Sequence, residues 1–261
     1  MTHLLVRSVR ARLRAAADPG RAPAMQAYMK SSMPFLGVDA PGQRRVWRVV
    51  FAAHPLATFE EWHGIVLTLW REARFREERY AAIALAGQRA YRPFRTRAAI
   101  PMLEEMIVTG AWWDLVDALA TNHLGDVLRN ERGAGRGASM ERRLRTWAAG
   151  DNLWKRRAAI LAQIGFKRDT DVQLLYACIA PSLLDQTGSA AKARPPAQRS
   201  ARSDSSRERA RDVRHDFFIR KAIGWALRQH ARVAPDEVRR YVRAHESQLS
   251  PLSVREALKH L

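Results

Sequence analysis

The stretch Trp112-Trp113-Asp114-Leu115-Val116-Asp117-Ala118-Leu119 carries the clearest structural signal in the chain. Its apolar residues recur at i, i+3, i+4 and i+7, the spacing that places side chains on one face of an α-helix. The residues of this stripe are Trp112, Leu115, Val116 and Leu119. A second helical stripe lies near the C-terminus, at Phe218, Ala222, Trp225 and Ala226. Both stretches predict helices with a buried face.

Helical periodicity extends through most of the chain, whereas alternating apolar and polar runs are nearly absent. The blocks at 77–91, 94–109 and 112–128 share no consensus, so a regular array of identical repeats is not expected. Stacked HEAT-like helical pairs tolerate such divergence, because each pair need only bury one face against its neighbours. The sequence therefore predicts an all-α fold of HEAT-like repeats, an α-solenoid, in a single domain of residues 1–261. An irregular globin-like bundle is the alternative.

The chain is strongly basic. Its 261 residues include 45 Lys and Arg against 26 Asp and Glu, which gives a net charge of +19 and a pI near 11.3. Such a charge favours binding to a polyanion. Hydrophobic residues make up 47% of the chain, a content that excludes a wholly disordered basic protein.

Three further features concern the compartment. No apolar run approaches the roughly 18 residues of a transmembrane helix. The arginines spread through residues 1–17 argue against a signal peptide. A single cysteine, Cys178, cannot form an internal disulfide. We therefore expect a soluble, cytoplasmic protein that does not contact a membrane.

Residues 185–212 interrupt the helical pattern. They contain two prolines and seven Lys or Arg, and they show no apolar periodicity. This composition predicts a disordered basic loop inserted in the ordered domain. Because the segment also holds four acidic residues, most of the +19 charge belongs to the rest of the chain.

Trp113 and Asp117 lie off the apolar stripe of their predicted helix. They are four residues apart, so they stack on one helix face. An indole ring beside a carboxylate attracts a cationic group, which makes the pair a candidate site. The alternative is a Trp–Asp pair buried against the next helix. Asp114 lies in the first turn of the predicted helix, where the helix dipole favours an acidic residue, so we interpret it as a structural residue.

A second candidate group lies at residues 151–161. Arg157 falls on the apolar face of this predicted helix, together with Leu153 and Ile160. A guanidinium in such a place must find a phosphate or a carboxylate, or extend to the rim. Arg157 is therefore either a phosphate contact or half of a structural ion pair. Arg156 points outward and is a candidate phosphate contact.

The third group surrounds Gly224 and Trp225. Apolar residues wrap much of this predicted helix, so Trp225 is expected in the core. Glycine in the middle of a helix costs about 1 kcal/mol relative to alanine. Gly224 therefore indicates a close approach of another helix, or access of a ligand to the backbone.

Motifs of other chemistries are missing from the sequence. It contains no HExxH, no Walker loop, no GxSxG and no GxGxxG after a strand. The eight histidines show no metal-ligand spacing, so no metal site is expected.

A series of short blocks occurs in a characteristic order. The blocks are Tyr28-Met29-Lys30, Phe35-Leu36-Gly37, the WWDxVD of residues 112–117, Asp151-Asn152-x-Trp154, the RAAIL of residues 157–161, the FFIxKAIGW of residues 217–225, and Pro251-Leu252-Ser253-x-Arg255-Glu256-Ala257. Together they resemble the DNA alkylation repair family, whose AlkD-like members are alkylpurine DNA glycosylases. The resemblance implies a right-handed superhelical stack of HEAT-like repeats with a basic concave face that holds duplex DNA.

The resemblance also implies an activity and its residues. The expected reaction is hydrolysis of the N-glycosidic bond of cationic N3- or N7-alkylated purines, the first step of base excision repair. The catalytic positions carried over by motif are Trp113, Asp117, Arg157 and Trp225. The expected DNA contacts are Tyr28, Lys30, Lys155, Arg156, Arg220 and Lys221. The family grips the sugar-phosphate backbone around the lesion and does not place the base in a deep pocket.

Elementary chemistry agrees with these roles. Cleavage of an N-glycosidic bond develops positive charge on the sugar, which a carboxylate and aromatic ring faces stabilise. A cationic alkylpurine leaves readily, so neither a cofactor nor a metal is expected. We also expect the protein to act as a monomer. The alternative hypothesis is a HEAT-like DNA-binding or scaffold protein that keeps the fold and charge without the catalysis.

Overall fold

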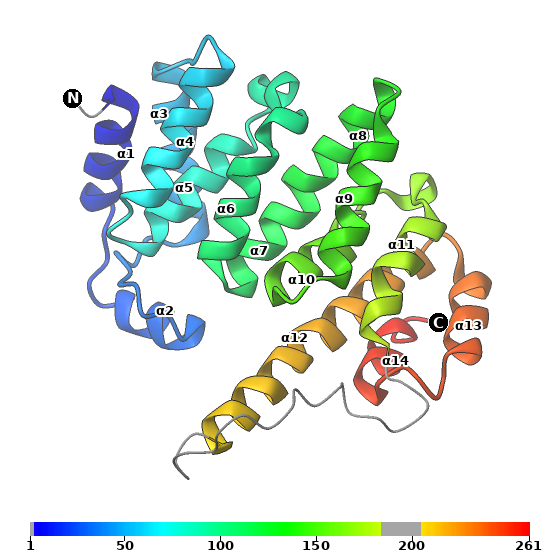
Figure 1. The fold of residues 1–261 in the computed structure, drawn as a ribbon. Helices are drawn as coiled ribbons and strands as arrows, with labels where there is room; N and C mark the ends of the chain where they lie inside the picture. The colour runs from blue at the N-terminus through cyan, green and yellow to red at the C-terminus, as the bar shows by residue number, and fades with distance from the viewer. Residues whose placement is uncertain (1–2, 184–204) are drawn as a thin grey trace, which may run out of the picture. The chain divides into compact units, whose positions relative to one another are not determined.

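The computed structural model describes residues 3–183 and 205–261 (Figure 1). Contacts divide the chain into two compact units, residues 1–135 and 136–261. All regular secondary structure of the described residues is helical. The predicted all-α class is thus confirmed, whereas the single domain stays a prediction.

The first unit consists of helices that follow one another closely along the chain. Its α-helices are α1 (Leu4–Ala15), α2 (Ala22–Met29), α3 (Ala40–Ala53), α4 (Phe59–Arg71), α5 (Arg76–Ala86), α6 (Ile100–Gly110), α7 (Trp113–Ala118) and α8 (Gly125–Gly133). Two 3₁₀ turns, Arg89–Phe94 and Arg97–Ala99, join α5 to α6. A π-helical segment, Leu119–Leu124, continues α7 into α8.

The second unit has the same character. Its α-helices are α9 (Gly137–Ala149), α10 (Leu153–Leu161), α11 (Val172–Ile179), α12 (Ser205–Ala231), α13 (Pro235–Ala244) and α14 (Pro251–Ala257). Short 3₁₀ turns lie at Lys167–Asp169 and Ala180–Ser182.

Helices of each unit pack mainly against near neighbours in the chain. In the first unit α4 packs on α5, and α1 on α3; in the second, α10 packs on α9 and α12. Large apolar side chains such as Trp62 and Trp70 are fully buried between these layers. Neighbour-on-neighbour packing is how a helical solenoid buries its core. The right-handed course and the basic concave face stay predictions.

Prolines mark the helix starts that the sequence indicates. Pro41, Pro235 and Pro251 each lie at the first or second position of a helix. A helix loses little there, because the N–H that proline lacks has no partner inside the helix at that position.

The predicted insert comprises residues 185–212. Its part up to residue 204 lies outside the described residues. Its end is different from the prediction, because residues 205–212 form the start of α12. This stretch contains Ser, Arg, Glu, Ala and Asp, with neither proline nor glycine. Good helix formers continue a helix even where no apolar stripe is present.

Trp112 also departs from the prediction. It precedes α7 in an extended conformation and is half-buried, so it is not part of the helical stripe. The chain turns sharply just before it, where Ala111 adopts a left-handed φ of 40°. The other stripe residues, Leu115, Val116 and Leu119, are fully buried as expected.

Gly224 has the packing role that the sequence suggested. A Cβ at this position would lie 2.5 Å from the Cβ of Glu256 and 2.9 Å from the carbonyl oxygen of Ser253. Both residues belong to α14, which α12 contacts extensively. Glycine thus permits the close approach of these two helices.

We expect Gly224→Ala to lower the free energy of unfolding by about 1–3 kcal/mol, because overpacking outweighs the gain in helix propensity. The matched control is Gly64→Ala in α4, where a new Cβ meets no atom within 4 Å. That change should raise stability by about 0.5–1 kcal/mol. Urea unfolding of both variants measures the difference, and equal effects would contradict the packing role.

Candidate active site and nucleic-acid interface

Helix α7 presents three different faces. Leu115, Val116 and Leu119 enter the core of the first unit. Asp114 and Ala118 line a hollow beside α2. Trp113 and Asp117 occupy the remaining face, and both are half-buried. The i, i+4 pairing predicted for Trp113 and Asp117 is therefore placed on one short helix, outside the core.

The two carboxylates of the WWDxVD block have different surroundings. Asp114 is tied to α5: its Oδ1 accepts from Arg76 Nη2 at 2.5 Å and its Oδ2 from the Tyr80 hydroxyl at 2.6 Å. The Arg76 and Asp114 side chains are only 6% and 5% exposed. Asp114 therefore joins α7 to α5, in addition to its favourable place in the first helical turn. Asp117 lies on the outer face of the same helix and is half-buried.

This network perturbs one further group. Burial, reinforced by the Asp114 carboxylate, raises the pKa of Tyr80 far above its usual range. Tyr80 therefore stays protonated and keeps donating to Asp114. Neither Arg76 nor Tyr80 stood out in the sequence, because only the fold brings α5 against α7.

A hollow of about 440 Å³ lies in the first unit between α2, α3, α5 and α7. Its walls carry aromatic and apolar side chains with few polar groups. The lining residues include Tyr28, Phe35, Gln43, Trp47, Tyr80 and Asp114. Tyr28, predicted to contact DNA, is 75% exposed, and Lys30 at the end of the same helix is also exposed.

Arg157 lies in the second unit, in α10, and only 5% of it is exposed. Its Nη1 donates a hydrogen bond of 2.5 Å to the carbonyl oxygen of Phe218 in α12. The guanidinium also lies 5.9 Å from the centre of the Phe218 ring. Arg157 therefore joins α10 to α12, and its contact with a phosphate stays a prediction.

Trp225 is half-buried, although the sequence pattern placed it in the core. Its neighbours Ala222, Ile223, Ala226 and Leu227 are buried instead. Helix α12 packs against both α10 and α14. Partial exposure is what a ring needs to face a ligand.

The remaining predicted DNA contacts differ in their surroundings. Lys155 lies 5.2 Å from the centre of the Trp147 ring, and Arg156 donates to the hydroxyl of Ser182 at 2.9 Å. Lys221 pairs with Glu256 at 2.7 Å. Arg220 is half-buried.

The candidate catalytic residues belong to both units. Trp113 and Asp117 lie in residues 1–135, and Arg157 and Trp225 in residues 136–261. That all four act on the same nucleotide stays a prediction.

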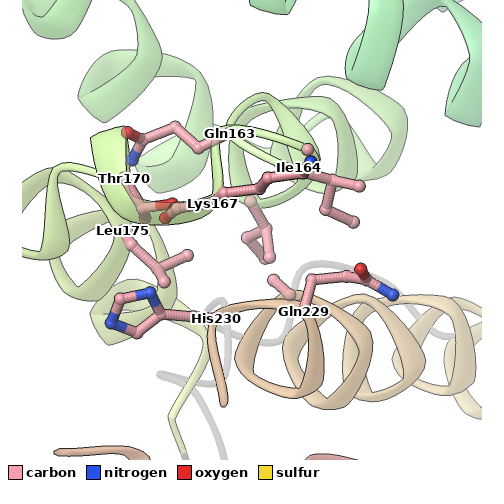
Figure 2. Close-up of a pocket in the computed structure, with 10 residues that line it drawn as sticks. Gln163, Ile164, Lys167, Thr170, Leu175, Gln229 and His230 are labelled. Atoms are coloured by element: carbon pink, nitrogen blue, oxygen red, sulfur yellow. Dashed lines mark hydrogen bonds between the residues drawn. The ribbon is translucent and has the colours of Figure 1, made fainter. Parts of the chain in front are cut away.

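A small cavity in the second unit is unsuited to a base. Figure 2 shows Gln229 and His230 of α12 facing side chains that include Ile164 and Leu175. The cavity has a volume of about 10 Å³, which is room for no more than a water molecule. Among the described residues, no group of His, Cys, Asp or Glu could hold a metal ion.

These features define an all-helical protein of the helical-repeat class, and comparisons with known proteins identify its family. The sequence profile described as "DNA alkylation repair enzyme" matches residues 9–194 and 206–261. A similar solved structure is described as "Predicted DNA alkylation repair enzyme from Enterococcus faecalis". It is 26% identical, with a TM-score of 0.67, and the match covers 94% of this chain and 96% of that one. No curated protein matches the chain.

The chain belongs to the DNA alkylation repair enzyme family, because the family profile covers most of its length. Its role is in DNA alkylation repair, and DNA is the partner that this family implies. Every helix in the part of the chain that the structure describes is too short or too polar to span a membrane.

Proposed function

We propose that the protein is a DNA N-glycosylase that removes cationic N3- and N7-alkylated purines from duplex DNA. The observation that carries the proposal is the outer face of α7. There, Trp113 and Asp117 lie four residues apart on one short helix, and both are half-buried. A scaffold protein has no need of an indole and a carboxylate on a face outside the core.

The reaction breaks the bond between C1′ of the sugar and the purine nitrogen. The bond pair goes to the cationic base, which leaves neutral, and the sugar becomes oxocarbenium-like. The carboxylate of Asp117 stabilises this charge and orients the water that adds to C1′. The water then loses a proton, so that the sugar ends with a hydroxyl group. The rings of Trp113 and Trp225 each add about 0.5–2 kcal/mol of cation–π stabilisation.

The net charge of +19 supports the DNA-binding part of the proposal. Lys and Arg that neutralise phosphates release counterions, so the affinity falls with salt and depends little on sequence. We propose that Tyr28, Lys30, Lys155 and Arg156 belong to this interface together with Arg220 and Lys221. The protein would act as a cytoplasmic monomer.

Arg157→Ala tests whether this buried arginine also holds a phosphate. If it does, the slope of log affinity against log salt should fall by about 0.9, since one fewer phosphate is neutralised. Base release should slow as well. The midpoint of thermal unfolding should also drop, because the Phe218 carbonyl oxygen loses its donor.

A fluorescent undamaged duplex, titrated at several salt concentrations, measures the slope for wild type and variant. An unchanged slope with a lowered unfolding midpoint would assign Arg157 a purely structural role. Release of methylated bases from duplex DNA is the direct test of the proposed activity.

A further inference from the structure

Arg79 is a half-buried arginine of α5 in the first unit, and no carboxylate neutralises it. Its neighbours in the same turn are paired: Arg76 with Asp114, and Glu78 with Arg10. Within the part of the chain that the structure describes, Arg79 forms no ion pair. Taking a charge partly out of water costs free energy that an anionic partner normally offsets. This cation is therefore without the partner that its burial calls for.

The guanidinium of Arg79 is held in one place. Its Cζ lies 4.7 Å from the centre of the Trp70 ring, and its Nη1 donates at 3.3 Å to the carbonyl oxygen of Thr109. Trp70 is itself fixed, because its Nε1 donates to the Thr109 hydroxyl at 2.8 Å. Gly110 makes room for this ring, since a Cβ there would lie only 3.1 Å from Trp70. Such pre-positioning lowers the entropic cost of binding an anion.

One part of this guanidinium is enclosed and another reaches the surface. Its Nε is buried without a hydrogen-bond partner among the described residues, whereas the bond from Nη1 to Thr109 is exposed. A guanidinium carries five N–H donors, so the terminal nitrogens keep donors for a second acceptor. Burial, with the nearby charge of Arg76, lowers the pKa of Arg79, but an arginine stays protonated at neutral pH. A fixed positive charge therefore remains at the surface.

This charge lies at the corner between α6 and α7. Thr109 belongs to the last turn of α6, and the chain leads from it within a few residues to Trp113, the first residue of α7. One turn before Arg79 on the same helix, Arg76 binds α7 through Asp114. Arg79 is thus attached to the corner from which the candidate catalytic helix starts.

We infer that Arg79 binds a backbone phosphate of the DNA strand on which the Trp113–Asp117 face acts, and so positions the alkylated nucleotide beside α7. The planar fork of a guanidinium matches a phosphate. The contact holds only the sugar-phosphate backbone, so it needs no pocket for the base. The inference rests on the proposed action on DNA. The alternative is structural, because a cation also stabilises the C-terminal end of a helix such as α6.

Arg79→Met separates the two explanations, since it keeps an unbranched apolar chain against Trp70 and removes the charge. The full chain is titrated with a fluorescent undamaged duplex at several salt concentrations. The slope of log affinity against log salt should fall by about 0.9, and the midpoint of thermal unfolding should stay within about 2 °C of wild type. Arg79→Lys should restore the slope, because a point charge also neutralises a phosphate. An unchanged slope in Arg79→Met would overturn the inference, and a lowered midpoint would then assign Arg79 to the end of α6.

The matched control is Arg71→Met. It removes the same charge from the neighbouring α4, where Arg71 already pairs with Glu105 at an exposed position. We expect this variant to keep the slope of wild type. A fall equal to that of Arg79→Met would show that loss of any positive charge has the effect, which would contradict a specific contact.

A single neutral linkage in the DNA locates the contact. The duplex carries a tetrahydrofuran abasic analogue, and the phosphates that flank it are replaced one at a time by methylphosphonate. At the contacted phosphate, wild type should lose affinity about fivefold, whereas Arg79→Met should lose nothing further. Equal losses for the two proteins at every flanking phosphate would overturn the inference. The assay measures binding without catalysis, so a coupled phosphate in a protein that releases no base would refute the proposed activity alone.

Discussion

Asp117→Asn should reduce the rate of base release by about a hundredfold or more, while the affinity for undamaged duplex stays within a few-fold of wild type. The substitution keeps the size and polarity of the side chain and removes a charge that acts mainly in the transition state. Single-turnover release of 7-methylguanine measures the rate, and fluorescence anisotropy measures the affinity.

The control for this variant is Trp113→Phe, which keeps a ring on the same helix face but with a weaker cation–π interaction. It should slow release by less than Asp117→Asn does. A parallel loss of DNA affinity and thermal stability in Asp117→Asn would show that the carboxylate is structural.

Asp114→Ala should have its main effect on folding. Removal of this carboxylate leaves Arg76 buried without its partner, because both side chains are almost fully enclosed. Breaking a buried ion pair in this way costs about 3–5 kcal/mol. Urea unfolding measures the loss.

Tyr80→Phe removes one neutral donor from the same Asp114 carboxylate and should cost only about 1 kcal/mol. Equal losses for Asp114→Ala and Asp117→Asn would contradict the division between a structural and a functional carboxylate. A loss below about 1 kcal/mol for Asp114→Ala would show that the Arg76 pair contributes little to stability.

The helical class and the positions of Trp113 and Asp117 on one face of α7 could be predicted because their signals are local. The spacing of Leu115, Val116 and Leu119 determines a helix face, and Trp113 and Asp117 then follow by geometry. The role of Gly224 could be predicted as well, because a glycine in mid-helix is costly unless something requires it.

What could not be predicted depends on contacts between distant segments. Arg76 and Asp114 are far apart in the sequence and meet only when α5 packs on α7. The hollow between α2, α3, α5 and α7 likewise combines Tyr28, Trp47 and Tyr80, which have no common motif. Trp225 was assigned to the core because a helix that is apolar on several sides does not reveal which side its neighbours cover.

The most direct test of the account is release of base from methylated duplex DNA by the purified protein. We expect free 7-methylguanine to appear in the soluble fraction and abasic sites to remain in the DNA, with wild type active and Asp117→Asn nearly inactive. A protein that binds the duplex with steep salt dependence but releases no alkylated purine would contradict the account. The alternative of a HEAT-like DNA-binding scaffold would then be favoured.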